Sequence, residues 1–364
     1  MDNPIKCFLF VCVLNVFFSV TLASNSQKLL IDHDGGADDA MAIFMALLNE
    51  KHFDGPKVVG ITTVHGNVNE PQVFENTQRI LDIADRRDVP IYRGCQSALM
   101  KDYPTDGYFG HDGLGDNSTK SYKPIKAKSD YASVAMSKLS KKYKDKLTIV
   151  TLGPLTNMAV AIKLDPGLLA RIWQLYVAAG NIYTNGMKLE FNVKMDIEGY
   201  FVVIHNGLAD KLTLIPAKVK KSLNLGRQWR KDTFGEINSD IVRSLNIFER
   251  ISLPKTKDWA PLDPVAMSIV LDSSIIKEQK YTLNGIFLCG NSKGRNTNDF
   301  KSKSPKQRLV FSCNKEPFRE FLMKIFSADD NKHDSDENDD SHDSHDHHHD
   351  HHHHHHDDSD DDDD

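Results

Sequence analysis

The chain has 364 residues, of which 40% are hydrophobic and 26% are charged, which is typical of a globular protein with one large domain or two small ones. Its formal net charge of −6 averages two unlike parts, because the last 36 residues hold 17 of the 51 acidic residues and 12 of the 17 histidines. The remaining body is basic, but its Lys and Arg residues are scattered and no aromatic residues alternate with them, so we expect no nucleic-acid partner.

The first 23 residues have the features of a secretory signal peptide. Lys6 precedes an apolar run at residues 8–20, and the small residues Thr21 and Ala23 follow it. This pattern predicts cleavage before Ser24 and a secreted, extracellular protein. Since no other stretch has 18 consecutive apolar residues, we expect no membrane span.

Short apolar runs alternate with helical patterns along the body of the chain, residues 24–328. The expected strands cover residues 28–31, 57–64, 90–92, 147–152 and 172–178. The expected helices cover residues 39–48, 70–83, 131–141 and 156–162. This alternation predicts a parallel sheet in an α/β fold, in which ligands bind at the carboxyl ends of the strands.

A long polar, glycine-rich segment follows at residues 101–128, and loops of this length are often functional. It contains the sequon Asn117-Ser118-Thr119, so Asn117 is a predicted N-glycosylation site in an exported protein.

Three cysteines remain once the predicted signal peptide is removed: Cys95, Cys289 and Cys313. Three cysteines can form at most one disulfide bond within the chain. We predict a Cys289–Cys313 bond, because both residues lie in apolar, strand-like runs, and Cys95 would then be a buried thiol.

The last segment, residues 329–364, is composed almost entirely of Asp, His, Ser and Asn and is predicted to be disordered. Its neutral imidazoles are suitable ligands for Zn²⁺, Cu²⁺ or Ni²⁺. Two interpretations stay open, a tail that binds transition metals and a solvated tail with no specific ligand.

A cluster of acidic residues follows the first expected strand. Its members are Asp32, Asp34, Asp38 and Asp39. Strand alternation places Asp32 and Asp34 on one face, and the glycines at 35–36 allow a tight turn before a helix that Asp38 is suited to cap. Carboxylates this close repel one another unless protons or a cation intervene, and oxygen ligands favour Ca²⁺ or Mg²⁺. A solvated acidic turn is the simpler alternative.

The cluster resembles the N-terminal DxDxGxDD signature of the inosine-uridine-preferring nucleoside hydrolases. Four further stretches are similar to the family's motifs in the same order: residues 61–67 with Asn76 after them, GPLTN at 153–157, EFN at 190–192, and Asp263-Pro264. The resemblance covers about residues 28–270. It implies a single open, doubly wound, mostly parallel sheet flanked by helices.

The resemblance also implies an activity and a cofactor. Family members hydrolyse the N-glycosidic bond of ribonucleosides to ribose and free base with a bound Ca²⁺. By position, the Ca²⁺ ligands would be Asp34, Asp39, Asp263 and the backbone carbonyl of Leu152. Asp34 would take a proton from the water that the ion binds.

The substrate contacts are implied in the same way. The residues expected to hydrogen-bond the ribose hydroxyls are Asp38, Asn67, Glu190 and Asn192. Asn192 would also help to stabilise an oxocarbenium-like transition state through its amide oxygen. The expected partner is a small ribonucleoside, and the expected assembly is a homo-oligomer, a dimer or tetramer.

The sequence departs from the family pattern at Leu262, where many members have a His that protonates the departing base. Some purine-specific members lack that His and stack the base between aromatic rings. Candidates for this are Trp259, Tyr108, Phe109 and Trp229. His111 resembles a second family position near the base, and the alternative is a loop histidine that orders only its own segment.

These features favour a purine nucleosidase that acts on substrates such as inosine. Two other functions remain open: a nucleoside-binding protein with weakened catalysis, because of Leu262, and a secreted factor that sequesters metal through its His/Asp tail.

Overall fold

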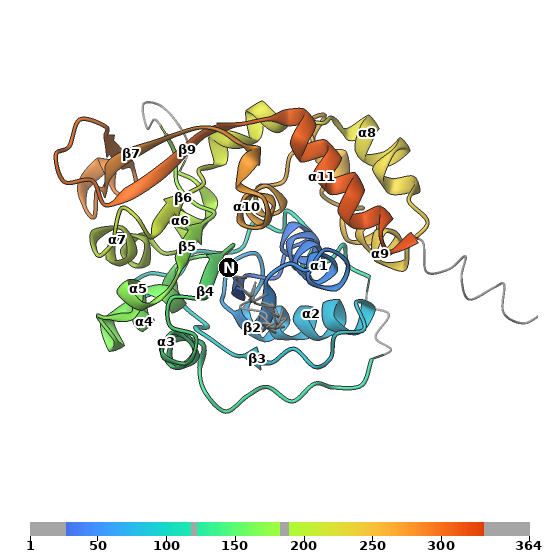
Figure 1. Cartoon of the computed structure of the whole chain (residues 1–364), viewed down its shortest axis with the longest axis horizontal. Helices are drawn as coiled ribbons and strands as arrows, with labels where there is room; N and C mark the ends of the chain where they lie inside the picture. Colours follow the sequence, from blue (N-terminus) through green and yellow to red (C-terminus); the bar gives the residue numbers. More distant parts are fainter. Residues whose placement is uncertain (1–26, 118–121, 183–188, 331–364) are drawn as a thin grey trace, which may run out of the picture.

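A computed structural model describes residues 27–117, 122–182 and 189–330 (Figure 1). The predicted signal peptide, tail residues 331–364, and Ser118 and Thr119 of the sequon lie outside the described residues.

The described strands form one sheet in the order β3-β2-β1-β4-β5-β6-β9-β7-β8. Their bounds are β1 Lys28–His33, β2 Lys57–Thr63, β3 Ile91–Tyr92, β4 Leu147–Thr151, β5 Gln174–Val177, β6 Leu212–Leu214, β7 Ile276–Ile286, β8 Asn296–Asp299 and β9 Gln307–Cys313. Neighbours from β3 to β9 pair in parallel, whereas β7 pairs antiparallel with β9 and β8. The predicted fold class, an open and mostly parallel sheet, is confirmed.

Helices flank this sheet. Their bounds are α1 Ala37–His52, α2 Glu70–Ile83, α3 Ala132–Lys142, α4 Thr156–Leu164, α5 Leu168–Arg171, α6 Phe191–Met195, α7 Ile197–His205, α8 Arg227–Asp232, α9 Asp240–Phe248, α10 Leu262–Leu271 and α11 Lys315–Ser327. The 3-10 helices are η1 Ala217–Leu223, η2 Phe234–Glu236, η3 Leu253–Lys255, η4 Ser273–Ile275 and η5 Gly290–Ser292. Every strand and helix expected from the sequence is present, with ends that differ by a few residues.

The two faces of the sheet carry separate hydrophobic cores. Leu29 and Ile31 of β1 belong to the core formed with α1, α2, α9, α10 and α11, whereas Leu30 belongs to the core formed with α3, α4, α5 and α7. This alternation follows from the two-residue period of a strand and explains why β1 is apolar without interruption. Across the described residues, no helix is both long and apolar enough to span a bilayer.

Helix α1 lies in the middle of the first core and packs against α10, although the two helices are far apart in the sequence (Figure 1). The contact brings residues near position 38 close to residues near position 263, which is where the sequence places its acidic motifs.

The predicted Cys289–Cys313 disulfide is wrong, because the structure has both residues as free thiols. In the antiparallel pair of β7 and β9, Cys313 lies opposite Ile276, where β7 begins, whereas Cys289 follows Ile286, where β7 ends. The two sulfur atoms therefore belong to opposite ends of this pair of strands. Cys95 is half-buried rather than fully buried.

Candidate functional site

The predicted site residues come from the carboxyl ends of neighbouring parallel strands. Asp34 follows β1, Asn67 lies in the loop after β2, and Leu152 follows β4 directly. Because β2, β1 and β4 are adjacent and parallel, these residues meet at one edge of the sheet.

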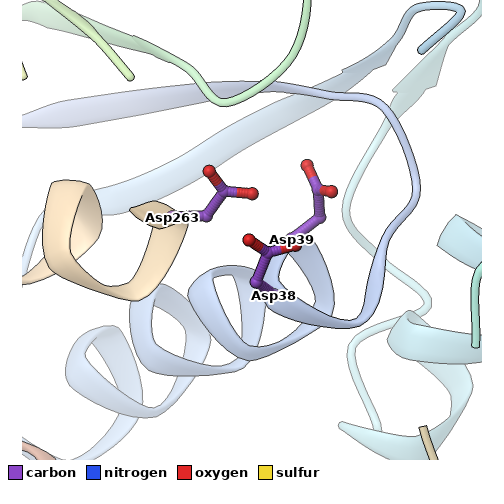
Figure 2. A group of neighbouring side chains, drawn as sticks. All are labelled: Asp38, Asp39 and Asp263. Atoms are coloured by element: carbon purple, nitrogen blue, oxygen red, sulfur yellow. The ribbon is translucent and has the colours of Figure 1, made fainter. Parts of the chain in front are cut away.

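Three carboxylates converge at the first turns of α1 and α10. Figure 2 shows Asp38 and Asp39 of α1 facing Asp263 of α10. One carboxylate oxygen from each lies within 4.8 Å of the others. The packing of α1 against α10 thus brings together acidic groups that are more than 200 residues apart.

Asp39 caps helix α1. The helix begins at Ala37, and the Oδ2 atom of Asp39 accepts a hydrogen bond from the N–H of Gly36 at 2.8 Å. Its Oδ1 atom accepts from the N–H of Asp34 at 3.2 Å. The expectation that Asp38 caps the helix is therefore wrong, since Asp38 lies inside the first turn and the N-cap position belongs to Gly36.

Asp34 is held between two loops that approach it closely. Its Oδ2 atom accepts a hydrogen bond from the N–H of Asn67 at 2.8 Å. A Cβ atom added to Gly66 would lie 2.0 Å from the same Oδ2, and one added to Gly153 would lie 2.8 Å from the Cβ of Asp34. Both loops therefore need glycine in order to pack around this carboxylate.

The carboxyl groups of the cluster have raised pKa values, with burial as the largest cause. The pKa of Asp38 is raised to about 8 and that of Asp39 to about 6. The pKa values of Asp34 and Asp263 are raised well above the usual range by burial and by the neighbouring aspartates. These groups need protons or a cation in order to stay together.

The donor set fits a hard divalent cation such as Ca²⁺. All candidate ligand atoms are oxygens, and the Oδ1 atom of Asp38 is buried without a hydrogen-bond partner among the described residues. An unpaired buried carboxylate oxygen is costly, and a nearby cation or a hydroxyl group of a bound ligand would satisfy it.

Glu190 and Asn192 form a second wall of the site. Glu190 caps α6, and its carboxylate accepts hydrogen bonds from the N–H groups of Asn192, Val193 and Gly180, each at 3.0 Å. The Nδ2 atom of Asn192 donates to the carbonyl oxygens of Leu152 at 2.6 Å and of Ala178 at 2.9 Å. The side-chain amide of Asn192 is therefore held in one orientation.

Two adjoining cavities lie above these groups. A cavity of about 270 Å³ is lined by the predicted site residues Asp34, Asp38, Asn67, Leu152, Glu190, Asn192 and Asp263. A second cavity of about 430 Å³ is lined by Trp259. Both share Asp38, Tyr108, Phe109, Ala217 and Lys220. The smaller cavity thus holds most of the acidic residues, and Trp259 lines only the larger one.

Only some of the residues predicted to contact the base lie beside the two cavities. Trp259 lines the larger cavity, and its indole N–H donates to Glu249 at 2.8 Å. Trp229 packs against Trp259 but lines neither cavity. His111 is exposed and also lines neither cavity. A contact between His111 and the base stays a prediction.

The structure places in or beneath the site two residues to which the sequence assigned no role in binding or catalysis. Asp32 lies beneath it, where its Oδ1 atom accepts from Thr62 at 2.6 Å and from Asn157 at 2.8 Å, and burial raises its pKa to about 7. Lys220 lines both cavities from η1. Its positive charge partly offsets the rise in the pKa of Asp38 that burial causes. No motif in the sequence marks Lys220.

Comparison with known proteins gives a consistent result. The family described as inosine-uridine preferring nucleoside hydrolase matches residues 29–320. An inosine-uridine preferring nucleoside hydrolase of Leishmania major is 25% identical over 320 residues, which cover 83% of this chain and 97% of that protein. Uridine nucleosidase 1 of Arabidopsis thaliana is 34% identical over 207 residues, 55% of this chain and 59% of that protein. Probable uridine nucleosidase 2 of the same plant is 36% identical over 165 residues, 44% of this chain and 49% of that protein, so the match spans only half to three-fifths of these two plant relatives.

Solved structures share the fold. A plant nucleoside hydrolase superimposes with a TM-score of 0.75 at 23% identity, covering 83% of this chain and 99% of the other. An inosine-guanosine nucleoside hydrolase gives 0.74 at 24% identity, covering 82% and 98%.

Proposed function

Because the chain belongs to the inosine-uridine preferring nucleoside hydrolase family, we propose that it hydrolyses the N-glycosidic bond of ribonucleosides to give ribose and a free base. The observation that carries this proposal is the convergence of Asp38, Asp39 and Asp263 beside Asp34, at the bottom of a cavity with polar walls. Oxygen atoms in this arrangement suit a cation and a sugar diol together.

We propose Ca²⁺ as the cofactor, held by Asp34, Asp39, Asp263 and the carbonyl oxygen of Leu152. The Leu152 carbonyl already accepts from Asn192, but a carbonyl oxygen has two lone pairs and can accept a second partner. When bound, the ion would supply positive charge that orients water and the ribose hydroxyls.

Different side chains of the site then carry out proton transfer, ribose binding and stabilisation of the transition state. Asp34 takes a proton from the attacking water, and its carboxylate is oriented for this by the N–H of Asn67. Asp38, Asn67 and Glu190 hold the ribose hydroxyls. The orientation of the Asn192 amide, set by its two donated hydrogen bonds, aims its oxygen at the sugar ring, where positive charge develops.

We propose a preference for purine nucleosides such as inosine. The support is Trp259, which lines only the larger cavity, together with Tyr108 and Phe109, which line both cavities; these rings suit the stacking of a large base. Some relatives are uridine nucleosidases and one similar structure is that of an inosine-guanosine nucleoside hydrolase, so the substrate panel must contain both purine and pyrimidine nucleosides.

The test is the release of reducing sugar from inosine, adenosine, guanosine and uridine, with and without EDTA. We expect ribose release that EDTA abolishes and that is fastest with a purine nucleoside. If nucleosides bind but no ribose is released, the result would instead support the second candidate, a nucleoside-binding protein. The apolar Leu262 at the cavity wall favours that candidate.

Removal of the 2′-hydroxyl is expected to lower kcat/KM strongly. In 2′-deoxyinosine the polar groups around the acidic cavity lose their partner, so we expect a fall of at least about a hundredfold relative to inosine. Parallel measurement of 3′-deoxyinosine shows whether both hydroxyls are held. Comparable turnover of inosine and 2′-deoxyinosine would contradict the assignment of the ribose to this cavity.

Further proposals concern the two ends of the chain, its glycosylation and its oligomeric state. We propose export through residues 1–23, glycosylation at Asn117, and a homo-oligomer, a dimer or tetramer. Mass spectrometry of the protein recovered from culture medium and light scattering test these points. Transition-metal binding by residues 329–364 is tested by Zn²⁺ titration of the full chain and of a chain that ends at Ala328, and equal binding by both would remove the proposal.

A further inference from the structure

The described lining of the active site holds no histidine that could protonate the departing base. Leu262 lines the acidic cavity with an apolar side chain, and His111 lines neither cavity. The Trp259 N–H is already donated to Glu249.

Lys220 occupies the position between the two cavities. It follows β6, whose carboxyl end lies at the same edge of the sheet as that of β1, and it projects from η1. The start of η1 is held by a hydrogen bond from the N–H of Ala217 to the carbonyl oxygen of Gly180, at 3.1 Å. The other end is held by Ser222, whose Oγ accepts from the N–H of Cys313 at 3.2 Å.

Lys220 lies where we expect the scissile bond of a bound nucleoside. If the ribose occupies the acidic cavity and the base occupies the larger cavity beside Trp259, the C1′–N bond lies at their shared boundary. Of the five residues at this boundary, Lys220 alone carries a positive charge. Its positive charge acts on the nearby carboxyl groups of Asp38, Glu190 and Asp263, but no ion pair or side-chain hydrogen bond with another described residue holds the ammonium group. The group can therefore bond to a ligand.

We propose that Lys220 activates the leaving base, in place of the histidine that the chain lacks at position 262. This role rests on the proposed hydrolase function. As the C1′–N bond breaks, its electron pair stays on the base nitrogen, and the ammonium group of Lys220 donates a proton to the base. Hydroxide from the attacking water bonds to C1′, and Asp34 takes the other proton of that water. Solvent then returns a proton to Lys220 and removes one from Asp34.

The same arrangement suits purines and pyrimidines. Purines have the acceptor N3 beside the glycosidic nitrogen, and uracil has O2 beside it. An ammonium group is a compact donor with three rotatable N–H bonds and can reach either atom. Lys220 therefore acts on the leaving group without itself selecting a base, and selection falls to the aromatic lining.

The experiment compares ribosides whose leaving group needs a proton with one whose leaving group does not. Lys220→Met is assayed with inosine, with uridine and with p-nitrophenyl β-D-ribofuranoside, whose phenolate departs without protonation. We expect kcat/KM to fall about a hundredfold for both nucleosides and by no more than about threefold for the nitrophenyl riboside. Lys220→Arg, which keeps the charge, is expected to recover part of the nucleoside activity.

Lys218→Met is the matched control, because Lys218 belongs to the same 3-10 helix but lines neither cavity. Equal losses on all three substrates in Lys220→Met would overturn the proposal and point to a role in holding the ribose, including its 5′-hydroxyl. Unchanged activity on all three would overturn it as well. Failure of the unaltered protein to release ribose from every substrate would instead reject the hydrolase function.

Discussion

Asp34→Asn is expected to lower kcat for inosine by about 10³-fold, because the amide keeps the shape of the side chain but cannot accept the proton of the attacking water. Its Oδ atom still accepts the hydrogen bond from the N–H of Asn67. The measurement is kcat on ribose release at saturating Ca²⁺, together with the melting temperature.

Asp32→Asn is the contrasting variant for Asp34→Asn. Asp32 is also fully buried and lies only two residues away, but its carboxylate bonds to Thr62 and Asn157 and lines neither cavity. We expect this variant to lower the melting temperature but to keep kcat within about tenfold, because the changed hydrogen bonds are structural. A larger loss of kcat in Asp32→Asn than in Asp34→Asn would refute the assignment of the base.

Removal of divalent metal is expected to destabilise the protein, and to do so more at high pH than at low pH. The carboxyl groups of Asp38 and Asp39 have pKa values of about 8 and about 6 in the folded chain, above the values near 4 of an unfolded chain. The metal-free folded state therefore binds more protons than the unfolded state. Its stability falls as pH rises from about 5 to about 8, because these groups must lose those protons.

The measurement is the melting temperature of EDTA-treated protein between pH 5 and pH 8.5, before and after the addition of Ca²⁺. At pH 8 we expect Ca²⁺ at about 100 times its dissociation constant to add about 2.7 kcal/mol, which corresponds to a rise of about 4 °C in a domain of this size. At pH 5 the increase is smaller, because protons compete for the same oxygens.

Asp263→Asn provides the internal test of this electrostatic account. The variant has one carboxylate fewer in the cluster, so its metal-free form is expected to be more stable than the metal-free unaltered protein at pH 8 and to respond weakly to Ca²⁺. Glu320→Gln, on the exposed surface of α11, changes the net charge equally and is the control. A Ca²⁺ response in Asp263→Asn equal to that of the unaltered chain would mean that the ion binds elsewhere.

The sequence by itself determined the α/β alternation and the order of the acidic motifs. Strand β1 and helix α1 could be predicted because an uninterrupted apolar run and a helical period are local patterns. The turn at Gly35 was also readable, since the structure has it at φ +87°, a conformation that glycine adopts without strain. The motifs around Asp34 and Asp263 further pointed to one site through their resemblance to a known family.

Tertiary structure alone decided which of these groups meet. The approach of Asp263 to Asp38 depends on the packing of α1 against α10, and no local pattern encodes that contact. The register of β7 against β9 separates Cys289 from Cys313, although both lie in apolar runs. Lys220 reaches the boundary of the two cavities because parallel strands end at a common edge, so its position depends on the whole sheet rather than on its neighbours in sequence.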